Sequence, residues 1–297
     1  MQLLSGHNRI KELLVSKALL ACALISIITT VSIVAILFTE AWAFFKVVSF
    51  REFLTSPLWT PLFEPQNWGI RPLIYGTLTV TIGAILFALP LGLGSAIYLS
   101  EYASPTTRNI IKPILEVLAG IPTVVYGYFA LIFITPVLQT LIPSIGVFNA
   151  LSASIAVGIM ITPMISSLSE EALLAVPNAM REGALALGST KLETTFKVII
   201  PYALSGIVAS VVLALSRALG ETMIVTIAAG ATPKLTFNPL ESVQTMTAYI
   251  VQVSMGDAPY GGIEHLSIFT VGITLFVFTV AMNLIAVAIT DRFKIGE

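Results

Sequence analysis

Two charged residues interrupt the apolar segment at residues 202–227: Arg217 and Glu221. An arginine at the centre of a membrane helix costs about 2.5–3.5 kcal/mol on an insertion scale, so charged residues in such segments usually have a function. If the segment is one helix, the two side chains lie four residues apart on one face and can form an ion pair. The planar guanidinium group can also donate hydrogen bonds to an oxyanion. The pair is therefore either a structural ion pair or an anion contact in a translocation pathway.

A second candidate is the polar stretch EALLAVPNAMREGALALGSTKLETTFKVIIPYA at residues 171–203. Gly188 follows a run of helical periodicity, where a helix can end in a left-handed conformation. Thr190 and Glu193 have the spacing of a capping box, which predicts a second short helix that ends at Pro201. A cytoplasmic pair of short amphipathic helices could dock into a groove on a soluble partner. The alternative is a solvated loop without a partner.

The composition is that of an integral membrane protein. Of the 297 residues, 56% are hydrophobic and 10% are charged, whereas soluble domains carry about 25% charged residues. The net charge of −1 argues against a nucleic-acid partner. With one cysteine, Cys22, and two distant histidines, His7 and His265, the chain lacks the material for a disulfide framework, a zinc site or a histidine-based catalytic dyad.

If the protein uses ATP, binding and hydrolysis of the nucleotide are expected in another chain. The sequence contains no G-x-x-x-x-G-K-[ST] motif, so the phosphate-cradling loop of P-loop ATPases is absent. It also contains no H-E-x-x-H and no C-x-x-C motif, which disfavours a membrane enzyme. A transporter is favoured, and if ATP drives it, a separate subunit must bind the nucleotide. A proton-coupled secondary transporter is the main rival, because an intramembrane arginine and glutamate suit proton coupling.

The elements that must position these residues are membrane helices. We expect an all-α, polytopic protein with six spans, each close to the length of about 20 residues that crosses the hydrocarbon. The expected spans are Ala18–Phe38, Ile74–Leu99, Val117–Leu138, Leu151–Leu168, Ala203–Ala228 and Ser267–Ile289. The first is kept as a helix rather than a signal peptide, because its apolar core is longer than the signal-peptide length of about 7–15 residues.

Positive charges predict the orientation, because cytoplasmic loops are enriched in lysine and arginine. With the N-terminus inside, the inner segments hold Arg9, Lys11, Lys17, Arg108, Lys112, Arg181, Lys191, Lys197, Arg292 and Lys294. The outer segments hold only Lys46, Arg51, Arg71 and Lys234. Both termini are therefore expected in the cytoplasm. Outside, Trp42, Trp59 and Trp68 are expected near the interface, as is a short helix at residues 246–256.

The stretch at residues 171–203 resembles the EAA motif of ABC importer permeases, E-A-A-x3-G-x9-I-x-L-P. The positions that match are Glu182, Ala184, Gly188 and Pro201, and those that differ conservatively are Gly183, Val198 and Ile200. The resemblance implies that this coupling loop, at about residues 169–201, inserts into a nucleotide-binding subunit. A secondary transporter has no need of such a loop. Residues 74–290 would form the type-1 transmembrane domain, preceded at residues 1–73 by the N-terminus, an extra helix and an outer loop.

Two further motifs resemble the phosphate-specific permeases within this family: EVLAGIPTVVYGYFAL at residues 116–131 and SRALGETM at residues 216–223. This resemblance implies a non-catalytic plasma-membrane subunit without a cofactor of its own, which translocates inorganic phosphate. Arg217, Glu221 and Glu116 would lie along the pathway, although Glu116 could equally be solvated at the inner edge of its helix. The implied partners are a second permease subunit, two ATP-binding subunits and an extracytoplasmic phosphate-binding protein. Sulfate or molybdate remains an alternative substrate.

Overall fold

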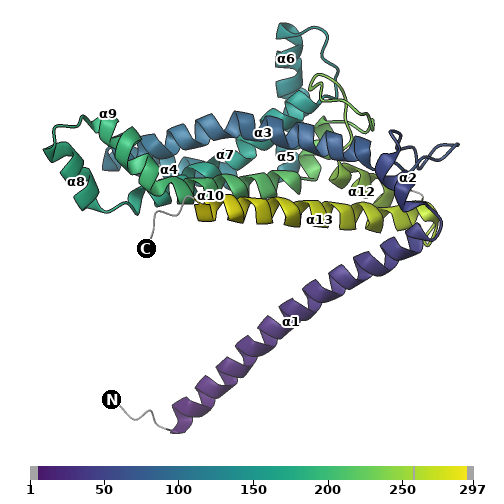
Figure 1. The fold of residues 1–297 in the computed structure, drawn as a ribbon, viewed down its shortest axis with the longest axis horizontal. Coiled ribbons are helices and arrows are strands. Elements are labelled where there is room, and N and C mark those ends of the chain that lie inside the picture. The colour runs from purple at the N-terminus through teal and green to yellow at the C-terminus, as the bar shows by residue number, and fades with distance from the viewer. Residues whose placement is uncertain (1–5, 257, 293–297) are drawn as a thin grey trace.

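The structure, a computed structural model, describes residues 6–256 and 258–292 (Figure 1). This described part is helical apart from loops and one isolated β-bridge between Trp59 and Trp68. The first helices are α1 (Gly6–Phe45), α2 (Phe50–Thr55), α3 (Arg71–Ile97), α4 (Pro105–Gly120), α5 (Thr123–Phe129), α6 (Thr135–Leu141) and α7 (Ala150–Leu174). The remaining helices are α8 (Asn178–Ala186), α9 (Lys191–Thr194), α10 (Ile200–Leu219), α11 (Met223–Ala228), α12 (Met246–Ser254) and α13 (Ile263–Arg292). Three π-helical turns complete the chain: η1 (Tyr98–Tyr102), η2 (Ala130–Ile134) and η3 (Thr195–Ile199).

Six of the described helical stretches are long and apolar enough to cross a membrane. They are Lys11–Phe45, Arg71–Tyr102, Thr123–Leu141, Ala150–Leu174, Lys191–Leu219 and Ile263–Ile289. The predicted all-α class and the six spans are therefore confirmed. Lys294, one of the cations used to predict the orientation, lies outside the described residues.

Helix α7 is the centre of the bundle, with α3 and α10 packed against it. Small residues allow the close approach, as is common in membrane helices. A Cβ atom added to Gly92 of α3 would lie 2.8 Å from Cβ of Ile165 on α7, so any larger residue would push the two helices apart. Gly158 of α7 similarly lies under Phe87 and the carbonyl oxygen of Ala84. The core of the protein thus depends on this tight helix pair.

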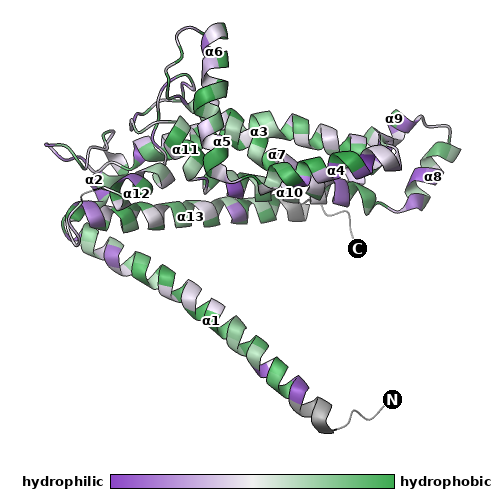
Figure 2. Ribbon diagram, turned by 180° about the vertical axis from the view of Figure 1, so that it is seen from behind, coloured by the Kyte–Doolittle hydropathy of each residue, from purple (hydrophilic) through white to green (hydrophobic). Residues whose placement is uncertain are grey.

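The bundle has two distinct ends, which we call the α8 end and the α2 end. In Figure 1, α8 and α9 lie at one end, and α2 with the loop before α3 lies at the other. Hydrophilic residues gather around α8 and α9 and in the loops near α2, whereas hydrophobic residues dominate the long helices between (Figure 2). This pattern is what a bilayer crossing requires.

Helix α1 departs from the rest of the bundle. It leaves at the α2 end and diverges from α13 along its length (Figure 1). None of its most apolar window is buried inside the chain. Only its last turns join the aromatic cluster at the α2 end, through Phe44. The surface of α1 must therefore be covered by lipid or by another protein.

The tryptophan prediction is wrong for two of three residues. Trp59 and Trp68 are buried, and they pack edge to face with each other and with Phe44 or Tyr249. Trp42 alone is exposed, with 70% of its surface accessible. Apolar burial of these large rings within the loop outweighs the preference of an indole for the membrane interface.

Two expected continuous helices are broken. The expected span Val117–Leu138 divides at Ile121, which is extended (ψ 130°) because the following Pro122 disfavours the α conformation. The candidate span therefore begins at Thr123, and Glu116 belongs to α4. The expected span Ala203–Ala228 ends as a helix at Leu219 and restarts as α11.

Other predictions need smaller corrections. Helix α7 continues to Leu174, beyond the expected end at Leu168. The short helix expected at the interface is present as α12, but five of its residues are buried under neighbouring helices: Met246, Thr247, Ala248, Tyr249 and Val253. Burial raises the pKa of the Tyr249 phenol, whose hydroxyl is hydrogen-bonded to Ser267. Helix α12 is therefore part of the core.

Candidate functional site

Arg217 and Glu221 form an ion pair across a helix break. Arg217 lies in the last turn of α10, and its Nη1 donates to Glu221 Oε2 at 2.9 Å. The prediction that one helix face carries both residues is wrong, because Glu221 lies between α10 and α11. Its other oxygen, Oε1, accepts hydrogen bonds from the backbone N–H groups of Met223 and Ile224 at 3.1 and 3.2 Å. The carboxylate therefore joins the end of α10 to the start of α11.

The two partners differ in exposure. The Glu221 side chain is 2% exposed and the Arg217 side chain is 41% exposed. Thr247 of α12 donates to the Glu221 carbonyl oxygen at 2.7 Å, which fixes the backbone at the break. The guanidinium group makes one further contact, a 3.5 Å approach of Nη2 to Met160 Sδ. Within the described part of the chain, the other guanidinium N–H groups have no hydrogen-bond partner, so they are available to a small anion.

The structure brings Glu116 and Arg217 to the same cavity. This cavity of about 400 Å³ lies between α4, the start of α5, α7 and α10. Its lining is mostly apolar and includes Ile121, Met160, Pro163, Met164 and Leu168. Apolar walls lower the local dielectric constant and so strengthen the electric field of the arginine. Glu116 is exposed and supplies a carboxylate to the cavity lining, whereas Glu221 is buried behind Arg217 as its ion-pair partner.

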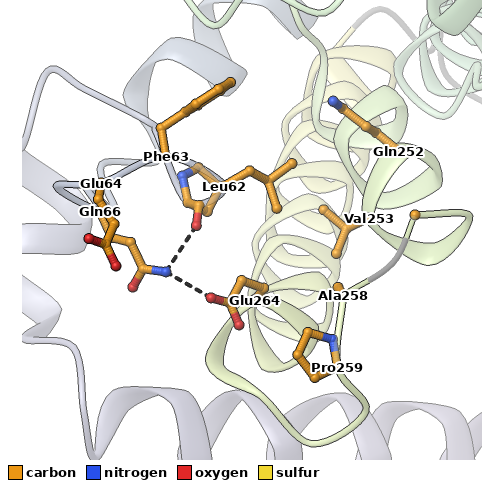
Figure 3. A pocket seen from close by; sticks show the side chains of 11 residues that line it. Leu62, Phe63, Glu64, Gln66, Gln252, Val253, Ala258, Pro259 and Glu264 are labelled. Carbon is orange, nitrogen blue, oxygen red and sulfur yellow. Dashed lines mark hydrogen bonds between the residues drawn. The ribbon is translucent and has the colours of Figure 1, made fainter.

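A second cavity, of about 410 Å³, lies at the α2 end (Figure 3). The loop before α3 lines it on one side, and the α12–α13 connection lines it on the other. Gln66 spans it, donating to the Pro61 carbonyl oxygen at 3.1 Å and to Glu264 Oε1 at 2.7 Å. Its described lining holds the carboxylates of Glu64 and Glu264 and no basic side chain. The Arg217 cavity is therefore the better candidate for an anion.

The stretch with the EAA-like spacing forms the predicted helix–turn–helix. Helix α8 is followed by Gly188 at φ 87°, the left-handed conformation that glycine adopts without strain. Thr190 and Glu193 form a complete capping box at the start of α9. Both local predictions are confirmed.

The predicted stop at Pro201 is wrong. Pro201 lies in the first turn of α10, and the helix runs on to Leu219. The turn before α10 is the π-helical turn η3. Proline lacks a backbone donor and clashes with the carbonyl four residues earlier, and the widened π turn relieves both problems. Pro136 follows η2 in the same way.

Helix α8 presents exposed side chains at the end of the molecule. Glu182 is exposed, Ala184 is partly buried, and nothing lies within 4 Å of a Cβ atom added at Gly183. Large apolar side chains are also exposed here: Met180, Leu185 and Leu187. The surface is therefore both apolar and sterically open.

The structure contains two further groups of ion pairs, around Arg181 and around Glu170, whose residues were not predicted as functional from the sequence. Arg181 of α8 donates to Glu101 Oε1 of η1 at 3.1 Å, to the Leu173 carbonyl oxygen at 2.7 Å and to the Val176 carbonyl oxygen at 2.5 Å. The arginine thus ties α8 to the ends of α3 and α7. Sequence reasoning used Arg181 only as a charge for orientation.

The second group is centred on Glu170 of α7, which is 1% exposed. Arg108 Nε lies 2.7 Å from Glu170 Oε1, and Lys112 Nζ lies 3.5 Å from Glu170 Oε2. Both cations come from α4. The spacing of Arg108, Lys112 and Glu116 at every fourth residue was the signal that could have revealed a charged face on this helix.

Comparison with known proteins identifies the family. Residues 88–295 match the family described as "Binding-protein-dependent transport system inner membrane component". The chain is 35% identical to "Probable ABC transporter permease protein YqgH" of Bacillus subtilis, over 93% of this chain and 89% of that protein. It is 33% identical to "Phosphate transport system permease protein PstC" of Mesorhizobium japonicum, over 90% of this chain and 86% of that protein.

The fold comparison agrees. A chain of a bacterial alginate ABC transporter, solved in complex with an alginate-bound periplasmic protein, superposes with a TM-score of 0.66 at 17% identity. The superposition covers 96% of this chain and 98% of that chain. The six candidate spans, the EAA-like helix–turn–helix and these matches lead to one conclusion. The chain belongs to the family of inner-membrane components of binding-protein-dependent transport systems, and it is a multi-pass permease subunit of an ABC importer.

Proposed function

We propose that this permease translocates inorganic phosphate into the cell. The observation that carries the proposal is the half-exposed Arg217 guanidinium in a mostly apolar cavity between α4, α5, α7 and α10. Guanidinium donors match the geometry of a tetrahedral oxyanion. Similarity to a permease named for phosphate transport supports phosphate as that anion.

The fixed charge acts as a weak anion contact. Glu221 compensates Arg217 between transport cycles, and Glu116 on the opposite wall limits the residence of the anion by repulsion. A translocation site must bind strongly enough to admit an ion and weakly enough to release it. One arginine faced by two carboxylates meets this requirement better than a cluster of cations.

The other subunits supply what this chain does not. The chain itself is a non-catalytic subunit without a cofactor, and two separate ATP-binding subunits hydrolyse ATP. One of them receives the exposed surface of α8 at Glu182, Ala184, Gly188 and Leu185. A second permease subunit completes the pathway, and an extracytoplasmic phosphate-binding protein delivers the substrate. Both chain ends and the α8 end face the cytoplasm.

The test is uptake by the reconstituted complex. The permease is co-purified with its partner subunits and placed in liposomes with the binding protein. We expect ATP-dependent uptake of radiolabelled phosphate that tenfold excess unlabelled phosphate suppresses and tenfold excess sulfate or molybdate does not. Uptake of labelled sulfate or molybdate in place of phosphate would assign the pathway to another oxyanion.

A further inference from the structure

Helix α4 is attached to the bundle in an unusual way. The structure describes all of α4, and none of its residues is buried. The chain is extended on both sides of it, at Ala103 and Ser104 before the helix and at Ile121 and Pro122 after it. These extended residues interrupt the helical hydrogen bonding, so α4 is connected to α3 and α5 by two non-helical joints. Its position must therefore depend on side-chain contacts with its neighbours.

Ion pairs with Glu170 connect α4 to α7. Glu170 is nearly inaccessible, and both of its charged partners, Arg108 and Lys112, come from α4. A buried carboxylate requires a counter-charge, because the protein interior does not solvate it as water does. The two cations are each about one-third exposed, so they can also be hydrated. Displacement of α4 would therefore leave the buried Glu170 carboxylate without a counter-charge, whereas water could solvate the two cations.

The same face of α4 continues into the Arg217 cavity. Arg108, Lys112 and Glu116 follow one another at intervals of four residues and so lie along one side of the helix. Arg108 contacts the end of α7, whereas Glu116 lines the cavity with Met164, nearer the middle of α7. Helix α4 thus runs antiparallel to α7. Its first half is fixed by charge, and its second half forms a wall of the cavity.

We propose that Glu170 is a positioning residue that holds α4 against α7 and thereby keeps Glu116 opposite Arg217 in the cavity. The inference rests on the proposed role of this cavity in anion transport. Helix α4 acts as a hinged wall whose closed position is defined by the buried carboxylate. Loss of the Glu170 charge lets α4 move about its two joints, which widens the cavity and removes Glu116 from the path of the anion.

The position of α4 can be measured by cross-linking. Cys22 is replaced by serine, and cysteines replace Leu115 of α4 and Leu168 of α7, which line the same cavity. A short bifunctional thiol reagent is added to the purified transporter complex without phosphate or ATP. We expect Glu170→Gln to lower the cross-linking yield at least threefold. Glutamine is chosen because it has the size of glutamate and leaves only partly exposed cations unpaired.

Glu171→Gln is the matched control, because Glu171 is the neighbouring glutamate on α7 and is exposed. Its cross-linking yield should equal that of the unmodified chain. Glu170→Asp retains the charge and should recover much of the yield and of the maximal phosphate uptake rate, both of which fall in Glu170→Gln. Recovery in Glu170→Asp, which keeps the charge on a shorter side chain, would show that α4 is positioned by the charge of residue 170 and not by the packing of its side chain.

The inference is overturned if Glu170→Gln and Glu171→Gln cross-link equally well. If Glu170→Gln does not assemble, the Arg108→Gln/Lys112→Gln variant decides, because it removes the same two ion pairs from the α4 side. A cross-linking yield equal to that of the unmodified chain then overturns the inference, and a reduced yield supports it. The cross-linking uses no substrate, so its outcome stands even if the transported anion is not phosphate.

Discussion

At the residue scale, the backbone at the helix break stabilises both charges of the Arg217–Glu221 pair. Arg217 lies at the C-terminal end of α10, where the helix dipole favours a cation, and Glu221 lies at the N-terminal end of α11, where it favours an anion. Glu221 is also held by two backbone N–H groups and is buried, whereas Arg217 is 41% exposed. The arginine is therefore the member of the pair that can exchange its partner for a substrate.

Arg217→Gln is expected to lower phosphate uptake by about 10- to 100-fold, because a hydrogen bond to a charged group contributes about 1.5–3 kcal/mol. Glu221→Gln should also impair uptake, since it leaves the arginine uncompensated, yet its amide oxygen can still accept from the start of α11. We expect the variant with both substitutions to remain inactive while membrane insertion and complex yield stay normal. Uptake assays and complex yields of the three variants are the measurements.

Lys234→Gln is the control for loss of a positive charge, because Lys234 forms an exposed pair with Glu241 outside the cavity. Its uptake should be unchanged. Near-normal uptake in the Arg217→Gln/Glu221→Gln variant, together with reduced assembly of the Arg217→Gln variant, would mean that the pair is only structural.

At the element scale, non-helical joints and π turns determine where the helices begin and end, and therefore which residues they position. The Ile121–Pro122 joint separates α4 from the third span, and the Gly220–Thr222 break lets Glu221 cap α11 instead of continuing α10. The turn between α8 and α9 lies on an exposed, apolar surface. Its geometry depends on Gly188, because a side chain at positive φ is strained.

Gly188→Val is therefore expected to weaken binding of the ATP-binding subunit and to abolish uptake, although the chain still inserts into the membrane. The left-handed conformation costs a β-branched residue about 1 kcal/mol or more, enough to redirect α8 relative to α9. Co-purification with the ATP-binding subunit and uptake are the measurements. Gly183→Ala is the matched control, since it lies in the interior of α8 with open space around it. Equal association of the two variants would show that the turn does not couple the subunits.

At the scale of the whole molecule, the chain leaves much of its own apolar surface uncovered. Helix α1 diverges from the bundle (Figure 1) and is mostly hydrophobic (Figure 2). It exposes large apolar side chains along its length, among them Leu20, Ile28 and Ile36. The long hydrophobic helices lie between the α8 end and the α2 end (Figure 2), so a bilayer around these helices has the two ends on opposite sides. The excess of lysine and arginine in the segments at the α8 end predicts, by the positive-inside rule, that this end faces the cytoplasm.

This orientation predicts the accessibility of three single cysteines in a Cys22→Ser chain. Cysteines at Ser144 and Thr232, in the exposed loops before α7 and before α12, should react with an impermeant thiol reagent added to intact cells. A cysteine at Ser189, in the α8–α9 turn, should react only after the cells are opened. Labelling of the Ser189 site in intact cells would reverse the orientation.

The sequence by itself determined the class, the number of spans and the turn between α8 and α9. Hydrophobic windows of about 20 residues suffice for the spans, because the bilayer imposes this length on every helix that crosses it. Gly188 and the Thr190–Glu193 box were predictable, because both depend on bonds within a few residues. The EAA-like spacing indicated the family for the same reason, since the helix–turn–helix that carries it is contained in one short stretch of the chain.

Only the tertiary structure decided which charged residues meet. Glu116 and Arg217 line one cavity although 100 positions separate them, and Glu170 holds Arg108 and Lys112 across a helix interface. The breaks at Ile121 and Gly220, and the burial of Trp59, also escaped the sequence patterns. The periodicity of apolar residues indicates which face of a segment is buried, but it does not indicate which other segment covers that face. Long-range pairing depends on that packing, and therefore on the whole chain.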